Sequence, residues 1–352
     1  MKKELLMASA LVSTLGVASV AQAVTATMAG SMKVGAEFES ADDLGTDNNQ
    51  VKDQSNFNIS LSETTDGGTT ISTSFEIVDE GTVAADDDNA IKLTFTDGSA
   101  LELLNAGNAA GTHAAAVPGA GGEQGIAGTS NNNAPTGIDF AAGSTALGVE
   151  WHSAADFMAD GLKVSASFST DNGAAKTATA RLENSWGIGA TYVTTAGDTT
   201  LTIGGGVADG EVANTGTQSD ADKGGFNIGV SAVTGDLTVG IGYGDGDSFQ
   251  ANATGNTTNN QIDGSVTKAG IKYVTGDITL ALGVTSGEAK DGAFGTAGTT
   301  DDSNDSTSAS VTYAVASGVS AVVGYTTVDQ NNEGSSTTDG GSAWYVGATM
   351  SF

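Results

Sequence analysis

The sequence contains no cysteine, only two histidines and two prolines, and 12 lysines and arginines against 42 aspartates and glutamates. Without cysteine, neither disulfide bonds nor thiolate metal sites are available. The histidines, His113 and His152, do not form a pair with the spacing of a transition-metal site, and so few histidines disfavour a Ser-His-carboxylate hydrolase. The formal net charge of −30 makes nucleic acids and anionic membrane surfaces poor partners.

Long hydrophobic runs are also missing after residue 23. No later stretch approaches the roughly 18 to 20 consecutive apolar residues that a spanning helix needs. Residues 1–23 differ: Lys2 and Lys3 precede an apolar run, and Ala21-Gln22-Ala23 fits a small-x-small cleavage pattern. We therefore predict a cleaved secretory signal peptide over residues 1–23, and a mature chain of residues 24–352 that crosses a membrane only if it forms a β-barrel.

The 51 glycines and the many serines, threonines and asparagines favour strands and turns. Short alternating strands flank tight turns at Gly197, Gly235, Gly276 and Gly318. Each unit holds two strands and a long loop, whereas a propeller blade needs four strands. The repeated unit is therefore predicted to be a β-hairpin.

Extending the hairpin pattern over residues 24–352 predicts 16 strands. The predicted strands are 28–39, 56–62, 69–77, 90–95, 100–104, 145–152, 161–169, 186–193, 199–207, 225–233, 237–243, 266–273, 278–285, 307–314, 319–326 and 344–352. Short turns and long loops alternate between them. These properties predict an all-β fold: a 16-stranded antiparallel transmembrane β-barrel with short periplasmic turns and long extracellular loops.

The last strand shows the alternation most clearly and ends the chain on an aromatic residue. Trp344, Met350 and Phe352 share its apolar face with valine and alanine. We predict that this strand closes the barrel on strand 28–39 and acts as an assembly signal. Outward-facing aromatic residues near both ends of the other strands suggest girdles at the two membrane interfaces.

Charged residues test the barrel prediction, because an arginine or lysine facing mid-bilayer costs roughly 2 to 4 kcal/mol. Strand alternation places the basic Lys33, Lys92, Lys163, Arg181, Lys268 and Lys272 and the acidic Glu37, Glu76, Glu102 and Glu150 on the inward face. These residues are predicted to line the pore. The other basic residues of the mature chain, Lys52, Lys176, Lys223 and Lys290, are predicted to lie in loops.

The longest connection, residues 105–144, is rich in glycine, alanine, serine and asparagine. We predict that this third loop folds inward and narrows the lumen. Its carboxylates, Glu123 and Asp139, are then part of the constriction, and a transverse field runs between them and a basic wall formed by Lys33, Lys92 and Lys163.

The strand layout, the hairpin from Phe57 to Gly68, the long loop after the fifth strand and the terminal Phe352 together resemble Gram-negative porins of the alphaproteobacterial, Rhodobacter-like type. The resemblance covers essentially all of residues 24–352. It implies a homotrimer of water-filled barrels in outer-membrane lipid and lipopolysaccharide, inserted by the barrel assembly machinery. One departure is that such porins usually carry an arginine cluster opposite the loop, whereas the only arginine here is Arg181.

The expected function is passive diffusion of small hydrophilic solutes and ions through a general porin, without catalysis and with a preference for cations because the chain is acidic. The alternative is a non-conducting, adhesin-like surface barrel whose acidic loops bind Ca²⁺. Candidate calcium ligands are Asp86, Asp87, Asp88, Asp301, Asp302 and Asp305. No other cofactor is expected.

Overall fold

The computed structural model describes residues 24–41, 49–79, 90–104, 107–119, 147–170, 181–213, 221–249, 261–289, 302–331 and 339–352. These residues form sixteen strands and one short helix. In order they are β1 Thr25–Ala41, β2 Asn49–Thr64, β3 Thr70–Asp79, β4 Ile91–Thr94, β5 Ala100–Leu104, α1 Ala109–Thr112, β6 Leu147–His152, β7 Leu162–Thr170, β8 Arg181–Ala196, β9 Thr199–Ala213, β10 Ala221–Thr234, β11 Leu237–Phe249, β12 Gln261–Thr275, β13 Ile278–Ala289, β14 Asp302–Ala316, β15 Val319–Asn331 and β16 Asp339–Ser351. In this part of the chain, no helix has the length and hydrophobicity to span a membrane.

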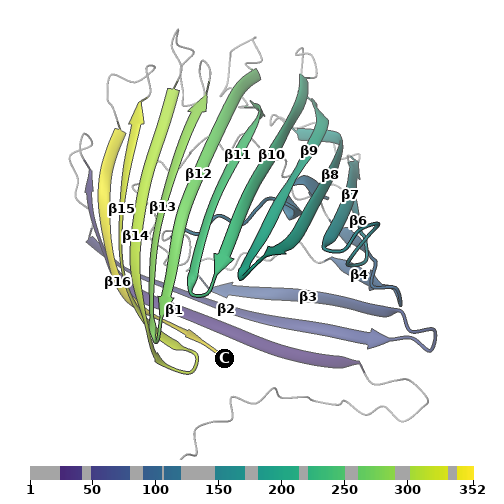
Figure 1. Ribbon diagram of the computed structural model, residues 1–352, viewed down its shortest axis with the longest axis horizontal. Helices are drawn as coiled ribbons and strands as arrows, with labels where there is room; N and C mark the ends of the chain where they lie inside the picture. The colour runs from purple at the N-terminus through teal and green to yellow at the C-terminus, as the bar shows by residue number, and fades with distance from the viewer. Residues whose placement is uncertain are drawn as a thin grey trace, which may run out of the picture.

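The strands form one closed barrel in which each is antiparallel to its neighbours in the chain, and β1 pairs with β16 (Figure 1). At this seam Phe38 lies opposite Trp344 and Val34 opposite Ala348. The backbones of Gly30 and Phe352 exchange two N–H···O bonds of 3.0 Å. The predicted 16-stranded antiparallel barrel, closed by the last strand on the first, is confirmed.

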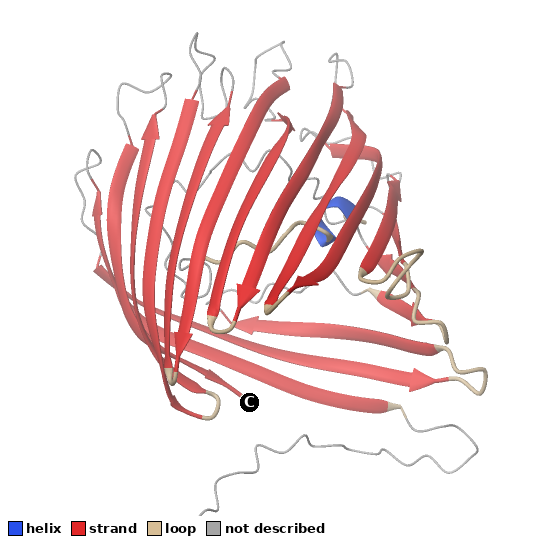
Figure 2. Ribbon diagram, viewed as in Figure 1, coloured by secondary structure: helices blue, strands red, loops and turns tan. Residues whose placement is uncertain are grey.

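Seven tight turns connect strands at one end of the barrel (Figure 2). Each has a glycine with positive φ: Gly68, Gly98, Gly161, Gly197, Gly235, Gly276 and Gly318. At Gly68 the φ of 84° is a conformation that residues with a Cβ rarely adopt, so glycine fixes where this hairpin reverses. The predicted positions of the short turns are confirmed.

Several strands extend further toward the long connections than predicted. β2 begins at Asn49, β11 ends at Phe249 and β14 begins at Asp302. As a result, Lys52 and Lys223 lie within β2 and β10, and the prediction that they lie in loops was wrong. These extensions are mainly polar, with exceptions such as Val51 and Phe249, so backbone pairing continues where the regular alternation of hydropathy has stopped.

The two faces of the barrel carry different side chains. Outward positions hold exposed apolar residues, with aromatic residues such as Phe38 and Trp186 toward the long connections and Tyr192 and Tyr313 toward the tight turns. Outward carboxylates whose side chains are described lie near the strand ends; they are Asp53, Glu63, Asp209, Asp245, Glu288, Asp305 and Asp329. The described lysine side chains lie at inward positions, as predicted.

Candidate pore constriction

Residues 107–119, the described part of the third loop, lie inside the barrel. Their helix α1 packs on the inner faces of β7, β8, β9 and β10, and the chain then runs on toward β11 and β12 (Figure 2). Ala109 and Ala110 are fully buried against this wall. The prediction of an inward-folded third loop is therefore confirmed for these residues, whereas Glu123 and Asp139 lie outside the described residues.

The wall beneath this segment lacks side chains along a line of inward glycines that we call the glycine track: Gly189, Gly204, Gly206, Gly229, Gly240 and Gly270. Several of them are cross-strand neighbours, as Gly189 is of Gly206 and Gly240 is of Gly270. A Cβ on Gly204 would collide with the carbonyl oxygen of His113, and one on Gly270 with that of Pro118. The loop backbone thus rests directly on the backbone of the wall.

Three hydrogen bonds attach the beginning of the segment to this wall. The N–H groups of Gly107 and Ala109 donate to the hydroxyls of Ser169 and Ser167, at 2.8 and 3.0 Å. The side-chain amide of Asn227 donates to the carbonyl of Ala110 at 2.9 Å. These bonds satisfy backbone groups that burial would otherwise leave without partners.

Glu150, on β6, accepts two further hydrogen bonds from the loop. The backbone N–H of Asn108 and the hydroxyl of Thr112 each donate to its carboxylate at 2.9 Å. Its exposed fraction is only 3%. Charge-assisted bonds of this kind are roughly twice as strong as neutral ones, so Glu150 fastens the loop to the wall.

The two histidines meet at the same place. His113 Nδ1 lies 2.7 Å from the hydroxyl of Thr191, and its Nε2 lies 2.8 Å from the hydroxyl of Ser165. The Ser165 hydroxyl is also 2.8 Å from His152 Nδ1. Burial is the main reason that the pKa of His113 is lowered from its ordinary value, with His152 and Lys163 adding to the effect.

Polar contacts continue from the histidines to the next strands. His152 Nε2 lies 3.4 Å from Glu102 Oε1, and Glu102 forms an ion pair with Lys92. The predicted pore residues Lys92 and Glu102 therefore neutralise each other. Sequence reasoning treated the histidines as isolated and missed that both reach the Ser165 hydroxyl, because nothing local in the sequence relates residue 113 to residue 152.

The other predicted pore residues are distributed around the ring. Lys163 is on β7, a strand that carries the loop, and so lies beside the loop rather than across from it. Lys33 and Glu37 are on β1, eight strands around the barrel from β9. Glu76 faces inward from β3, and Lys268 and Lys272 do so from β12, where they pair with Gly242 and Thr238. Arg181 begins β8.

The predicted calcium ligands are not gathered in the part of the chain that the structure describes. Asp86, Asp87, Asp88 and Asp301 lie outside the described residues, Asp302 begins β14 and Asp305 faces outward from the same strand. Within the described ranges, no three histidines, aspartates or glutamates are grouped to hold a metal ion.

The inner wall is balanced in charge. Described inward side chains include five lysines and five glutamates: Lys33, Lys92, Lys163, Lys268 and Lys272, and Glu37, Glu39, Glu76, Glu102 and Glu150. The other inward residues are mainly glycine, serine, threonine and asparagine. Among the side chains that the structure describes, the inner wall is therefore polar and close to neutral.

Comparisons with known proteins agree with this architecture. A family described as Gram-negative porin matches residues 8–333. Among solved structures, a porin refined at 1.8 Å resolution is 17% identical, with a TM-score of 0.64 over 93% of this chain and 100% of its own. An anion-selective porin from Comamonas acidovorans is 12% identical, with a TM-score of 0.62 over 94% and 100%.

A third solved structure is a trimer form of OmpT, an outer membrane protein of Vibrio cholerae. It is 16% identical to this chain, with a TM-score of 0.61, and the match covers 94% of this chain and 100% of OmpT. Among curated proteins, none matches the sequence. At these identities, the solved structures show only that the fold is shared. The match to the family model is what assigns the chain to a family.

Proposed function

Because this chain belongs to the Gram-negative porin family, whose members are outer-membrane channels, we propose that it is a general diffusion porin of the alphaproteobacterial type. The observation that carries the proposal is the loop seated inside a closed barrel. Residues 107–119 cover one side of a polar inner wall and leave the strands of the opposite side without this covering. Small hydrophilic solutes then pass down their gradients, and lumen width and wall polarity set the exclusion limit.

The preference for cations is a finer part of the proposal. The described inner wall is close to neutral, whereas the whole chain carries a net charge of −30. The carboxylates of Asp209, Asp245 and Asp329 lie near the strand ends where the long connections begin. An acidic mouth of this kind raises the local concentration of cations, even though the wall itself is balanced.

The proposal also covers export and assembly. Residues 1–23 would be removed as a signal peptide, and β16 with its terminal Phe352 would serve as the signal for the barrel assembly machinery. The mature barrel would form a homotrimer in outer-membrane lipid and lipopolysaccharide; the Vibrio cholerae relative solved in a trimer form supports this. Calcium on the acidic connections is an additional, separable part of the proposal.

Conductance in planar bilayers tests the function. The purified protein should produce stepwise channels, and a salt gradient should give reversal potentials of the sign for cation preference. A barrel that inserts but produces no steps would instead be the non-conducting surface protein. An anion preference would overturn the selectivity proposal alone.

The role of the loop needs a separate variant. Deleting residues 110–138 should raise the single-channel conductance and admit larger solutes, because the segment on the glycine track is then missing. Deleting residues 291–300, in the connection between β13 and β14, is the control and should leave the exclusion limit unchanged. An unchanged limit after the first deletion would show that the loop does not form the constriction.

A further inference from the structure

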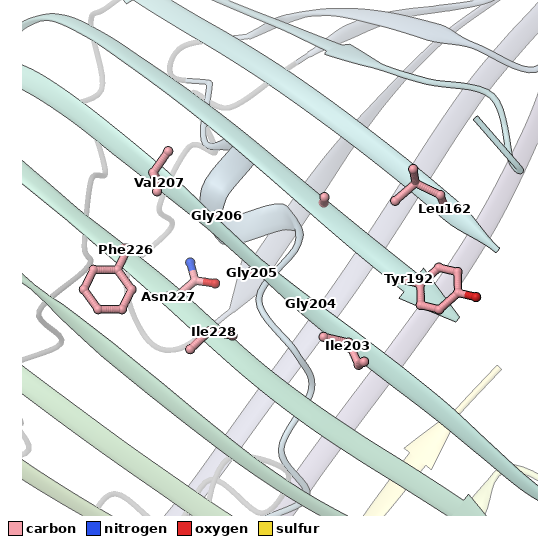
Figure 3. Close-up of a pocket in the computed structure, with 11 residues that line it drawn as sticks. Leu162, Tyr192, Ile203, Gly204, Gly205, Gly206, Val207, Phe226, Asn227 and Ile228 are labelled. Carbon is pink, nitrogen blue, oxygen red and sulfur yellow. The ribbon is translucent and has the colours of Figure 1, made fainter. Parts of the chain in front are cut away.

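The outer face of the barrel has a hollow directly behind the seat of the loop. Its floor is Gly205 on β9, and its volume is about 440 Å³ (Figure 3). Six larger side chains stand around it: Leu162, Tyr192, Ile203, Val207, Phe226 and Ile228. Apart from the Tyr192 hydroxyl, these surrounding side chains are apolar.

The sequence of β9 explains why the wall is hollowed there. Gly204, Gly205 and Gly206 are consecutive, so this strand has no side chain on either face at that level. Gly205 is paired with the small Ala190 on one side, while Ile203 and Val207 project outward two residues before and after it. The inward neighbours Gly204 and Gly206 lie against His113 and Ala110 of the loop.

Along the strands, the hollow lies between two outward aromatic residues. Phe226 borders it toward the long connections and Tyr192 toward the tight turns, and both belong to the outward aromatic residues near the strand ends. Their partners in β9 are Val207 and Ile203, which lie four residues apart, or roughly 13 Å along a strand. The apolar depression therefore occupies the band between the two aromatic levels.

An apolar hollow in this position does not suit water, because it offers too few polar groups to replace water's hydrogen bonds. Hydrocarbon is the solvent of this face in an outer-membrane barrel, and a flexible chain of methylene groups adapts to an open, uneven hollow better than a rigid ring does. We propose that the hollow around Gly205 is a binding site for one acyl chain of an outer-membrane lipid, held against the part of the wall that carries the loop.

Photolabelling of the whole protein tests this site. The barrel is reconstituted in vesicles that contain phosphatidylethanolamine with a diazirine in its acyl chain, irradiated, and analysed by peptide mass spectrometry. Labelling of Ile203, Val207 and Ile228 should exceed several-fold that of Leu282, Val311 and Val323, which face outward between the same aromatic levels on β13, β14 and β15. Equal labelling all around the barrel would show only a general lipid layer and would overturn the proposal.

A second test uses variants that fill the hollow. Ala190→Phe, or the smaller Ala190→Leu if the first does not fold, should abolish the excess labelling. Ala321→Phe is the matched control, because Ala321 is also an exposed outward alanine but lies on β15, away from the hollow. An excess that survives both Ala190 variants would overturn the site. Labelling that appears only after the oligomer is dissociated would also overturn the proposal, because a neighbouring barrel, and not a lipid, would then cover the hollow.

Discussion

The wall beneath the loop and the wall across the barrel from it use glycine for different purposes. On the glycine track, Gly189, Gly204 and Gly240 leave room for atoms of the loop. On the opposite wall, Gly35 and Gly347 leave room for the ring of Tyr345, a side chain of that wall itself, which is 2% exposed. Inward glycines therefore indicate close packing on both walls. The packing positions the loop only where the atoms that lie on the glycine belong to the loop.

The two walls also differ in how they satisfy buried polar groups. Under the loop, Glu150 and Ser167 accept hydrogen bonds from loop backbone. Across the barrel, Glu37 is fully buried and accepts from the side chain of Gln50, a cross-strand neighbour. The first set couples the loop to the barrel, whereas the second stabilises the sheet alone. Variants on the two walls should therefore separate pore geometry from barrel stability.

The largest effect is expected for Gly204→Val. The added side chain would overlap the His113 carbonyl and push the loop toward the lumen axis, so single-channel conductance should fall. Overpacking of this kind should also lower the free energy of unfolding by about 1 to 3 kcal/mol, measured by urea titration.

Gly35→Ala is the matched control on the opposite wall, because its Cβ would approach the Tyr345 ring instead of the loop. It should lower stability while leaving conductance nearly unchanged. Equal losses of conductance in Gly204→Val and Gly35→Ala would show that the glycine track does not determine the width of the pore.

A smaller effect is expected for Glu150→Gln. The amide removes the charge and cannot accept from both Asn108 and Thr112 with the same geometry, so about 1 to 2 kcal/mol of unfolding free energy should be lost. Increased current noise should accompany this loss, since the beginning of the loop is less firmly attached. Glu76→Gln, an inward carboxylate on β3, is the comparison, and identical noise in both variants would argue against a fastening role for Glu150.

Most of the barrel could be predicted because its physical causes are local. Period-two alternation gives the face of each residue in strands such as Leu237–Phe249, and glycines such as Gly235 mark the reversals. The strand ends could not be predicted in the same way. Beyond the membrane band both faces are polar, as in Asp245 to Asp247, and only backbone pairing continues.

The seat of the loop was harder to predict because it depends on contacts distant in sequence. The partner of Gly204 is residue 113, and that of Gly270 is residue 118. A signal was nevertheless present: β11 has glycine at the successive inward positions Gly240, Gly242, Gly244 and Gly246, where ordinary lumen positions carry polar side chains. Such a run predicts close approach of another backbone but does not identify it.

The smallest of the three effects is a dependence on pH. It tests how the wall beneath the loop responds when His113 is protonated. Burial, with His152 and Lys163 nearby, lowers the pKa of His113, so the docked loop favours the neutral ring. Its contribution to docking is therefore complete above the ordinary pKa of about 6.5 and is lost as the pH falls below that value.

Glu150 and Glu102 also face this site, but their carboxylates lie beside His152, at 3.8 and 3.4 Å from its ring nitrogens. We expect conductance to change as the pH falls below about 6.5, and the change to be reduced in His113→Gln, which stays neutral. Lys33→Met on the opposite wall should keep the full pH response. If conductance depends on pH in the same way in His113→Gln and in the unmodified protein, the titrating group is not His113. The two walls would then not differ in their response to protonation.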